Sequence, residues 1–115
     1  MTTFQDLLIE HQDRTSEVID RYIYKYRHLE CQKTIYTWNL FILENAKDVI
    51  AELTQSAIDV FHQATINRVS LDRDDFNSIR GVNLAAAARY EEELRKLYEN
   101  LVRIEKTKEN VNERI

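Results

Sequence analysis

Two pairs of residues have a spacing at which one helix face could present two metal ligands. His28 and Cys31 are three residues apart, and so are Asp59 and His62. Imidazole, thiolate and carboxylate groups bind zinc, but a structural zinc site needs four ligands. Neither pair belongs to a CxxC, ExxH or HExxH motif. We therefore expect no metal site and no cofactor, and we interpret His28 as a half-buried side chain beside a small buried thiol.

An acidic run later in the chain also has the residue types of a cation site. Asp72, Asp74 and Asp75 lie close together, but the central glycine and terminal glutamate of an EF-hand calcium loop are missing. Ser70 is a good N-cap residue, and carboxylates in the first turn are stabilised by the helix dipole. The run therefore predicts a helix that begins near Leu71.

Arg21 and His28 are seven residues apart, so a helix would place them on one face. A guanidinium there could hold a phosphate while an imidazole moves a proton. The pair resembles the Arg-x4-6-His pattern of HEPN ribonucleases, which are all-helical dimers of comparable size. This resemblance implies a ribonuclease or toxin that uses Arg21 and His28, and we keep it as an alternative function.

Aromatic and basic residues alternate between Arg21 and His28. Such a strip can stack on bases and neutralise phosphates, or it can concentrate binding energy at a protein interface. It can also bury its rings in the chain's own core while the cations reach water. The chain has 16 Lys and Arg against 20 Asp and Glu, a net charge of −4. A protein partner is therefore favoured over nucleic acid, and a nucleic-acid-binding regulator remains the second alternative.

Nine residues are expected to bind the partner. The aromatic ones would anchor helices, and the basic ones would select an acidic partner and speed encounter. They are Arg21, Tyr22, Tyr24, Lys25, Tyr26, Arg27, Tyr36, Trp38 and Phe41.

Composition predicts which elements position these residues. The chain has 115 residues, of which 43% are hydrophobic and 31% charged, with one glycine and no proline. Tight β-connections need glycine and proline, whereas helices do not. The sequence therefore predicts a single all-α domain over residues 1–115.

Apolar residues recur at helical spacing through the first half. The pattern predicts helices over residues 3–31 and 34–68, which either meet near residues 31–34 or form one continuous long helix. Counting in sevens from Leu8 gives this seam: Thr15, Tyr22, Leu29, Tyr36, Leu43, Ile50, Ala57 and Ala64. Over residues 35–43, apolar side chains surround nearly the whole helix, so more than one neighbour must cover it. We expect a third helix, a second chain, or both.

Gly81 is expected to end a short helix over residues 71–80 in a left-handed conformation. Asn83 can then cap an amphipathic helix over residues 84–110, followed by a frayed tail over residues 111–115. The predicted fold is an antiparallel helical bundle of three long helices and one short helix, with coiled-coil packing and completed by oligomerisation.

The sequence predicts a cytoplasmic protein, or one exported without a cleaved leader. It has a single cysteine, its beginning lacks the features of a signal peptide, and its longest apolar run is too short to span a membrane. In size, helical pattern and scarcity of glycine the chain resembles WXG100-like hairpins and helical secretion chaperones, although Trp38 lacks the glycine of Trp-x-Gly. Small phage-encoded inhibitors share these features. We predict a non-enzymatic interaction module: an adaptor, a secretion-type chaperone or an inhibitor.

Overall fold

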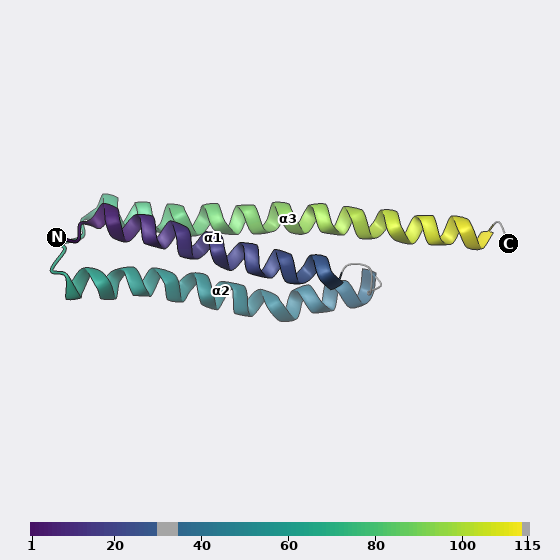
Figure 1. The fold of residues 1–115 in the computed structure, drawn as a ribbon, viewed down its shortest axis with the longest axis horizontal. Coiled ribbons are helices and arrows are strands. Elements are labelled where there is room, and N and C mark those ends of the chain that lie inside the picture. Colours follow the sequence, from purple (N-terminus) through teal and green to yellow (C-terminus); the bar gives the residue numbers. More distant parts are fainter. Residues whose placement is uncertain (30–34, 114–115) are drawn as a thin grey trace.

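The computed structural model describes residues 1–29 and 35–113, which form three long helices and no strand. They are α1 (Phe4–Leu29), α2 (Ile35–Ile66) and α3 (Arg73–Glu113). Helix α2 runs antiparallel to α1, and α3 returns parallel to α1 and extends beyond the end of the α1–α2 hairpin (Figure 1). The bundle measures 70 × 20 × 19 Å. The all-α prediction is confirmed.

Helices α1 and α2 pack against each other, which one continuous helix could not do. The expected junction at residues 31–34 and the end of the expected tail, residues 114–115, lie outside the described part of the chain. Helix α1 begins with a capping box. The Thr3 amide donates to Asp6 Oδ2 at 2.9 Å, and the Asp6 amide donates to Thr3 Oγ1 at 3.3 Å.

Helix α2 ends in a Schellman motif at Arg68. The Val69 amide donates to the Ala64 carbonyl at 2.8 Å, and the Arg68 amide donates to the Thr65 carbonyl at 3.2 Å. Arg68 has a φ of 55°, the left-handed conformation that glycine adopts at least cost. Among the described residues the left-handed conformation thus occurs at Arg68, where α2 ends, and not at Gly81.

Helix α3 begins after Asp72, which replaces Ser70 as the N-cap. The Asp75 amide donates to Asp72 Oδ1 at 2.9 Å, and the Asp72 amide donates to Asp75 Oδ2 at 3.1 Å. The helix then continues through Gly81, which has no positive φ. The expected short helix is thus the first part of α3, because residues 84–88, which include four alanines, favour continued helix over a break.

The core consists of two hydrophobic clusters along the bundle axis. The larger cluster surrounds Ile19, Ile23 and Tyr26 of α1, and the smaller one includes Leu7 of α1 and Val60 of α2. Helix α1 packs against both other helices more extensively than they pack against each other. Helix α1 is therefore the central element, and α2 and α3 each keep an outward side.

A buried polar layer separates the two clusters, with one residue from each helix. Nδ1 of His11 lies 2.9 Å from Oγ of Ser56, which also accepts a hydrogen bond from Arg14 Nε at 3.4 Å. The Ser56 hydroxyl can donate its proton to Nδ1 while its oxygen accepts from Arg14, and in that tautomer the imidazole proton is on Nε2. That Nε2 and Oδ1 of Asn83 are both buried without a hydrogen-bond partner in the described chain. In that tautomer Nε2 is a donor and Oδ1 is its complementary acceptor.

The continuity of α3 predicts the effect of replacing its glycine. Gly81→Ala should raise the free energy of unfolding by about 0.5–1 kcal/mol, because alanine is the better helix residue and an added Cβ meets no atom within 4 Å. Urea denaturation followed by circular dichroism measures this change. A loss of stability would indicate that Gly81 ends a helix, as the sequence alone suggested.

Burial of His11 predicts a dependence of stability on pH. Burial, assisted by the nearby charge of Arg14, lowers the pKa of His11 below 6.5. The unfolded chain then binds a proton that the folded chain does not, so stability is lost as the pH falls below about 6.5. We expect stability to decline between pH 7 and pH 5.5. This loss of stability at low pH should be smaller in His11→Gln and unchanged in His62→Gln, which removes an exposed imidazole. Equal losses in both variants would contradict the prediction.

Candidate protein-interaction surface

The helical period divides the aromatic strip of α1 between the core and the surface. Tyr22 and Tyr26 are four residues apart and share the inward face, whereas Tyr24 lies on the opposite side and is 66% exposed. The sequence shows three tyrosines at alternating positions, but a helix buries only those on the inward face. The alternation of aromatic and basic residues in the sequence therefore did not show which of the rings are exposed.

Tyr26 is the centre of an aromatic cluster that joins all three helices. Its ring meets Trp38 edge-on at a centroid distance of 5.9 Å and Phe41 at 5.6 Å. Its hydroxyl lies 2.8 Å from that of Tyr90, and burial raises the pKa of both phenols. Tyr26 and Trp38 are almost completely buried, and Tyr22 and Phe41 partly so. These four expected partner-binding residues are largely enclosed by the chain's own helices.

The three cations of the strip connect α1 to its neighbours. Arg21 forms an ion pair with Glu52 of α2 at 2.9 Å, and Arg27 with Glu93 of α3 at 3.3 Å. Nζ of Lys25 donates to Asn45 Oδ1 at 3.0 Å and lies 5.5 Å from the centre of the Phe41 ring. Each cation expected to select an acidic partner thus has an intramolecular partner.

The Tyr22–Glu52 contact favours one protonation state near neutral pH. A hydrogen bond from Tyr22, followed by the contact with Arg21, lowers the pKa of Glu52. Burial and the Glu52 carboxylate raise the pKa of Tyr22 to about 12. Near neutral pH, Tyr22 is therefore a neutral phenol beside the ionised carboxylate of Glu52, in the contact between α1 and α2.

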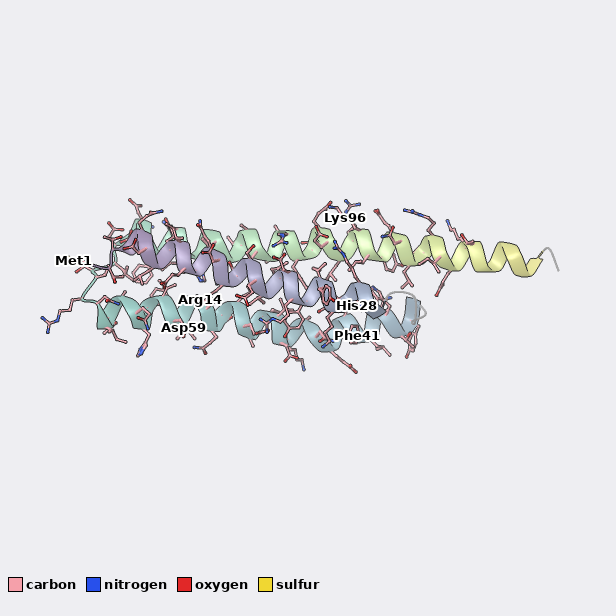
Figure 2. All side chains as sticks on the ribbon, in the orientation of Figure 1. Met1, Arg14, His28, Phe41, Asp59 and Lys96 are labelled. Carbon is pink, nitrogen blue, oxygen red and sulfur yellow. The ribbon has the colours of Figure 1, made fainter. Side chains whose placement is uncertain are left out.

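The residues considered for nuclease chemistry also contact their own chain. Arg21 binds Glu52, and the His28 ring meets Tyr24 edge-on at 4.4 Å. His28 lies toward the end of the bundle where α1 ends (Figure 2). Cys31, the other member of its possible metal pair, falls outside the described residues. Within residues 1–29 and 35–113, no group of three or more His, Cys, Asp or Glu side chains is placed to hold a metal ion.

The largest unpartnered apolar feature of α2 is a stripe on its outward side, which we call the outer seam. Its large side chains are Tyr36, Leu40, Leu43, Ile50 and Ile58, exposed by 73, 45, 67, 64 and 50%. Spacings of three and four residues keep these positions on one side of the helix, and Lys47 and Thr54 complete the pattern. Three of them, at positions 36, 43 and 50, belong to the seam counted in sevens from Leu8. The packing of residues 35–43 thus leaves one side of α2 open.

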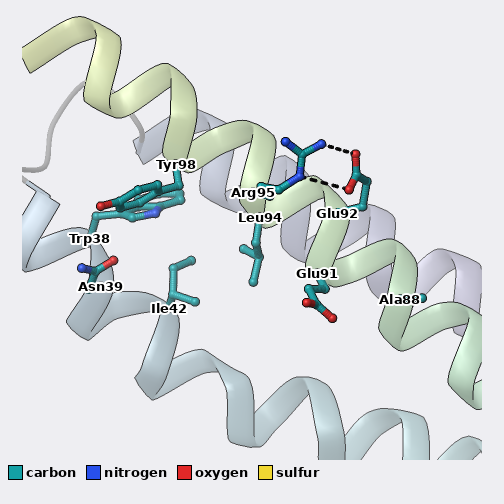
Figure 3. Close-up of a pocket in the computed structure, with 9 residues that line it drawn as sticks. All are labelled: Trp38, Asn39, Ile42, Ala88, Glu91, Glu92, Leu94, Arg95 and Tyr98. Carbon is teal, nitrogen blue, oxygen red and sulfur yellow. Dashed lines mark hydrogen bonds and ion pairs between the residues drawn. The ribbon is translucent and has the colours of Figure 1, made fainter. Parts of the chain in front are cut away.

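A groove between α2 and α3 adjoins the outer seam. It encloses about 430 Å³ and is lined by Trp38, Asn39 and Ile42 of α2 and by α3 residues that include Leu94 and Tyr98. Figure 3 shows Leu94 and Ile42 pointing into the space between the helices. On the outer side of α3, Arg95 binds Glu92 and Glu99, each at 2.6 Å. The groove therefore has an apolar floor and a rim whose charges are largely paired.

Sequence reasoning missed Leu40 and Ile58 of the outer seam and the α3 side of the groove. A second count from Leu40, which reaches Lys47 and Thr54, would have identified the companion positions of the stripe. The groove is lined by residues from two helices, and no pattern within one helix shows that these residues lie together. In the described part of the chain no helix is apolar over enough residues to cross a bilayer. Comparison with known proteins finds no matching family, curated protein or solved structure.

The contrast between the core and the outer seam predicts two different mutational effects. Trp38→Ala should lower the free energy of unfolding by about 3–5 kcal/mol, because it leaves a cavity among Tyr26, Phe41 and the groove floor. Tyr36→Ala should change it by no more than about 0.5 kcal/mol, because the ring is exposed. Urea denaturation of the two variants measures the difference. Equal effects would show that the two rings occupy similar environments.

Proposed function

We propose that this protein is a non-enzymatic helical interaction module, an adaptor, chaperone or inhibitor, that binds a protein chain along the outer seam of α2. The observation that carries the proposal is the exposure of five large apolar side chains in one continuous stripe. Lys47 is the one charged residue among the seven seam positions. A contiguous apolar stripe of this kind is characteristic of surfaces that bind a helix.

The size of the seam decides how strong such binding can be. Fully burying a large apolar side chain stabilises a complex by roughly 1.5–3 kcal/mol, and the seam residues are already one quarter to one half covered. The seam as a whole can therefore supply roughly 5–10 kcal/mol, against a cost of association of roughly 4–15 kcal/mol. The partner would need contacts beyond the seam, and the adjoining α2–α3 groove provides apolar surface for them.

The proposal changes the roles of the nine residues expected to bind a partner. Tyr36 belongs to the outer seam and keeps its role. Tyr26 and Trp38 pack in the core, on the inward side of α2. Arg21 links α1 to α2 through Glu52, and Arg27 links α1 to α3 through Glu93. Because these cations are paired within the chain, selection of the partner rests on apolar contact and helix register.

The ribonuclease and nucleic-acid alternatives draw no comparable support. Both need cations directed toward phosphate groups. Arg21, Lys25 and Arg27 instead bind Glu52, Asn45 and Glu93. A contact protein therefore accounts for more of the exposed surface than either alternative.

Site-specific photocrosslinking in the cells of origin tests the proposed function. A photoreactive aromatic residue at Leu43, expressed at the native level, should produce a covalent adduct with a protein, either another copy or a different chain. The same residue at Ile9 is the matched control, because Ile9 is an exposed apolar residue of α1 outside the seam. Absence of adducts from Leu43, Tyr36 and Ile50 would refute the proposal.

A further inference from the structure

We propose that the outer seam of α2 is occupied by the outer seam of a second copy of this chain, with the two helices antiparallel. This inference rests on the proposed function, because it identifies the partner of that same surface. The assembly is a symmetric dimer in which each copy covers the open side of the other. Self-complementary surfaces of this kind form two-fold dimers.

The spacing of the seam defines the register. From Tyr36 the heptad positions of α2 alternate steps of four and three residues; beyond Thr54 they pass Ala57, next to the seam residue Ile58, and reach Phe61. Ala57 and Phe61 are both partly buried and pack against the smaller hydrophobic cluster. In antiparallel heptad packing, each a position of one helix lies opposite a d position of the other helix. The resulting layers pair residues of one copy with residues of the second: Tyr36 with Phe61, Leu40 with Ala57, Leu43 with Thr54 and Lys47 with Ile50.

Two of the four layers pair a large side chain with a smaller one. Leu40 and Leu43, the two leucines of the seam, each face a smaller residue, Ala57 or Thr54, whereas the Tyr36–Phe61 and Lys47–Ile50 layers each pair two large side chains. Ile58 follows Ala57 and adds apolar surface beside Leu40 of the other copy. Alternation of large and small residues across facing positions gives close packing without voids.

Charge favours the antiparallel orientation over the parallel one. Parallel pairing in register would place the two Lys47 side chains in one layer, and like charges there are destabilising. Antiparallel pairing places Lys47 against Ile50, where the lysine stem covers apolar surface and the ammonium reaches water. The flanking Glu44 then faces the neutral Gln55 of the other copy. No layer of this register contains two charges of the same sign.

The available area favours a partner as wide as this bundle. The stretch from Tyr36 to Phe61 is roughly 38 Å long, so contact along α2 alone covers roughly 400 Å² per copy, which is half of the ~800 Å² per partner in a standard stable interface. The bundle is 20 Å wide. Contact that extends over the α2–α3 groove increases the covered area toward the standard size. A second copy of the bundle has this width, and an isolated helix does not.

Disulfide trapping between two different single-cysteine proteins tests the register. Cys31 is first replaced by serine, and Leu43→Cys and Thr54→Cys are then prepared separately, one with an affinity tag. Under mild oxidation the mixture should give a crosslinked heterodimer, because the two positions face each other between copies. Either protein alone should give at least tenfold less dimer, because its two cysteines lie roughly 16 Å apart along the helix axis.

Parallel pairing would instead crosslink each single variant to itself, and absence of any dimer would mean that α2 does not pair with α2. Either result would overturn the inference.

Light-scattering mass across a dilution series of the native chain gives an independent test. A dimer should form in the micromolar range, and Leu43→Glu/Ile50→Glu should weaken it at least tenfold while circular dichroism shows the same helix content. Ile9→Glu, which places the same charge on exposed apolar surface of α1, should leave the dimer intact. A native chain that stays monomeric at every concentration overturns the self-pairing. If Leu43 still gives adducts in cells, the proposed function stands with a different partner; without adducts, both proposals fail.

Discussion

Helix α1 lies between two longer helices, and this placement determines how α2 and α3 pack. Tyr26 shows how it operates, because its ring contacts Trp38 and Phe41 of α2 while its hydroxyl meets Tyr90 of α3. Both neighbours direct their inward faces to α1 and contact each other less. Helix α2 is apolar on more sides than one central neighbour can cover, so its outer seam stays exposed in the monomer.

The buried polar layer acts on the same packing in a different way. His11, Ser56 and Asn83 come from different helices and lie at one level of the bundle, between the two hydrophobic clusters. A shift of one helix along another would bury these polar groups against apolar side chains, which costs free energy when a hydrogen bond is lost. The hydrogen bond between His11 and Ser56 thereby favours one register of α1 against α2.

Several features of the fold follow from local sequence alone. Scarce glycine and absent proline predicted an all-α chain, and the heptad count predicted that Tyr36, Leu43 and Ile50 lie on one side of a helix. The expectation of a helix end at Gly81 was wrong, because Gly81 has no positive φ and α3 continues through it into the four alanines of residues 84–88. Helix ends depend on the hydrogen bonds that each terminus finds, and a glycine by itself does not supply them.

Side-chain type and helical period are local properties, and they are enough to give α2 more apolar surface than one neighbour can cover. Which part of that surface is covered depends on how the three helices pack. Trp38 and Leu43 look equivalent in the sequence, yet one is 2% and the other 67% exposed. The difference arises because α1 and α3 pack on one side of α2, and contacts between helices distant in the chain leave no periodic signal in α2.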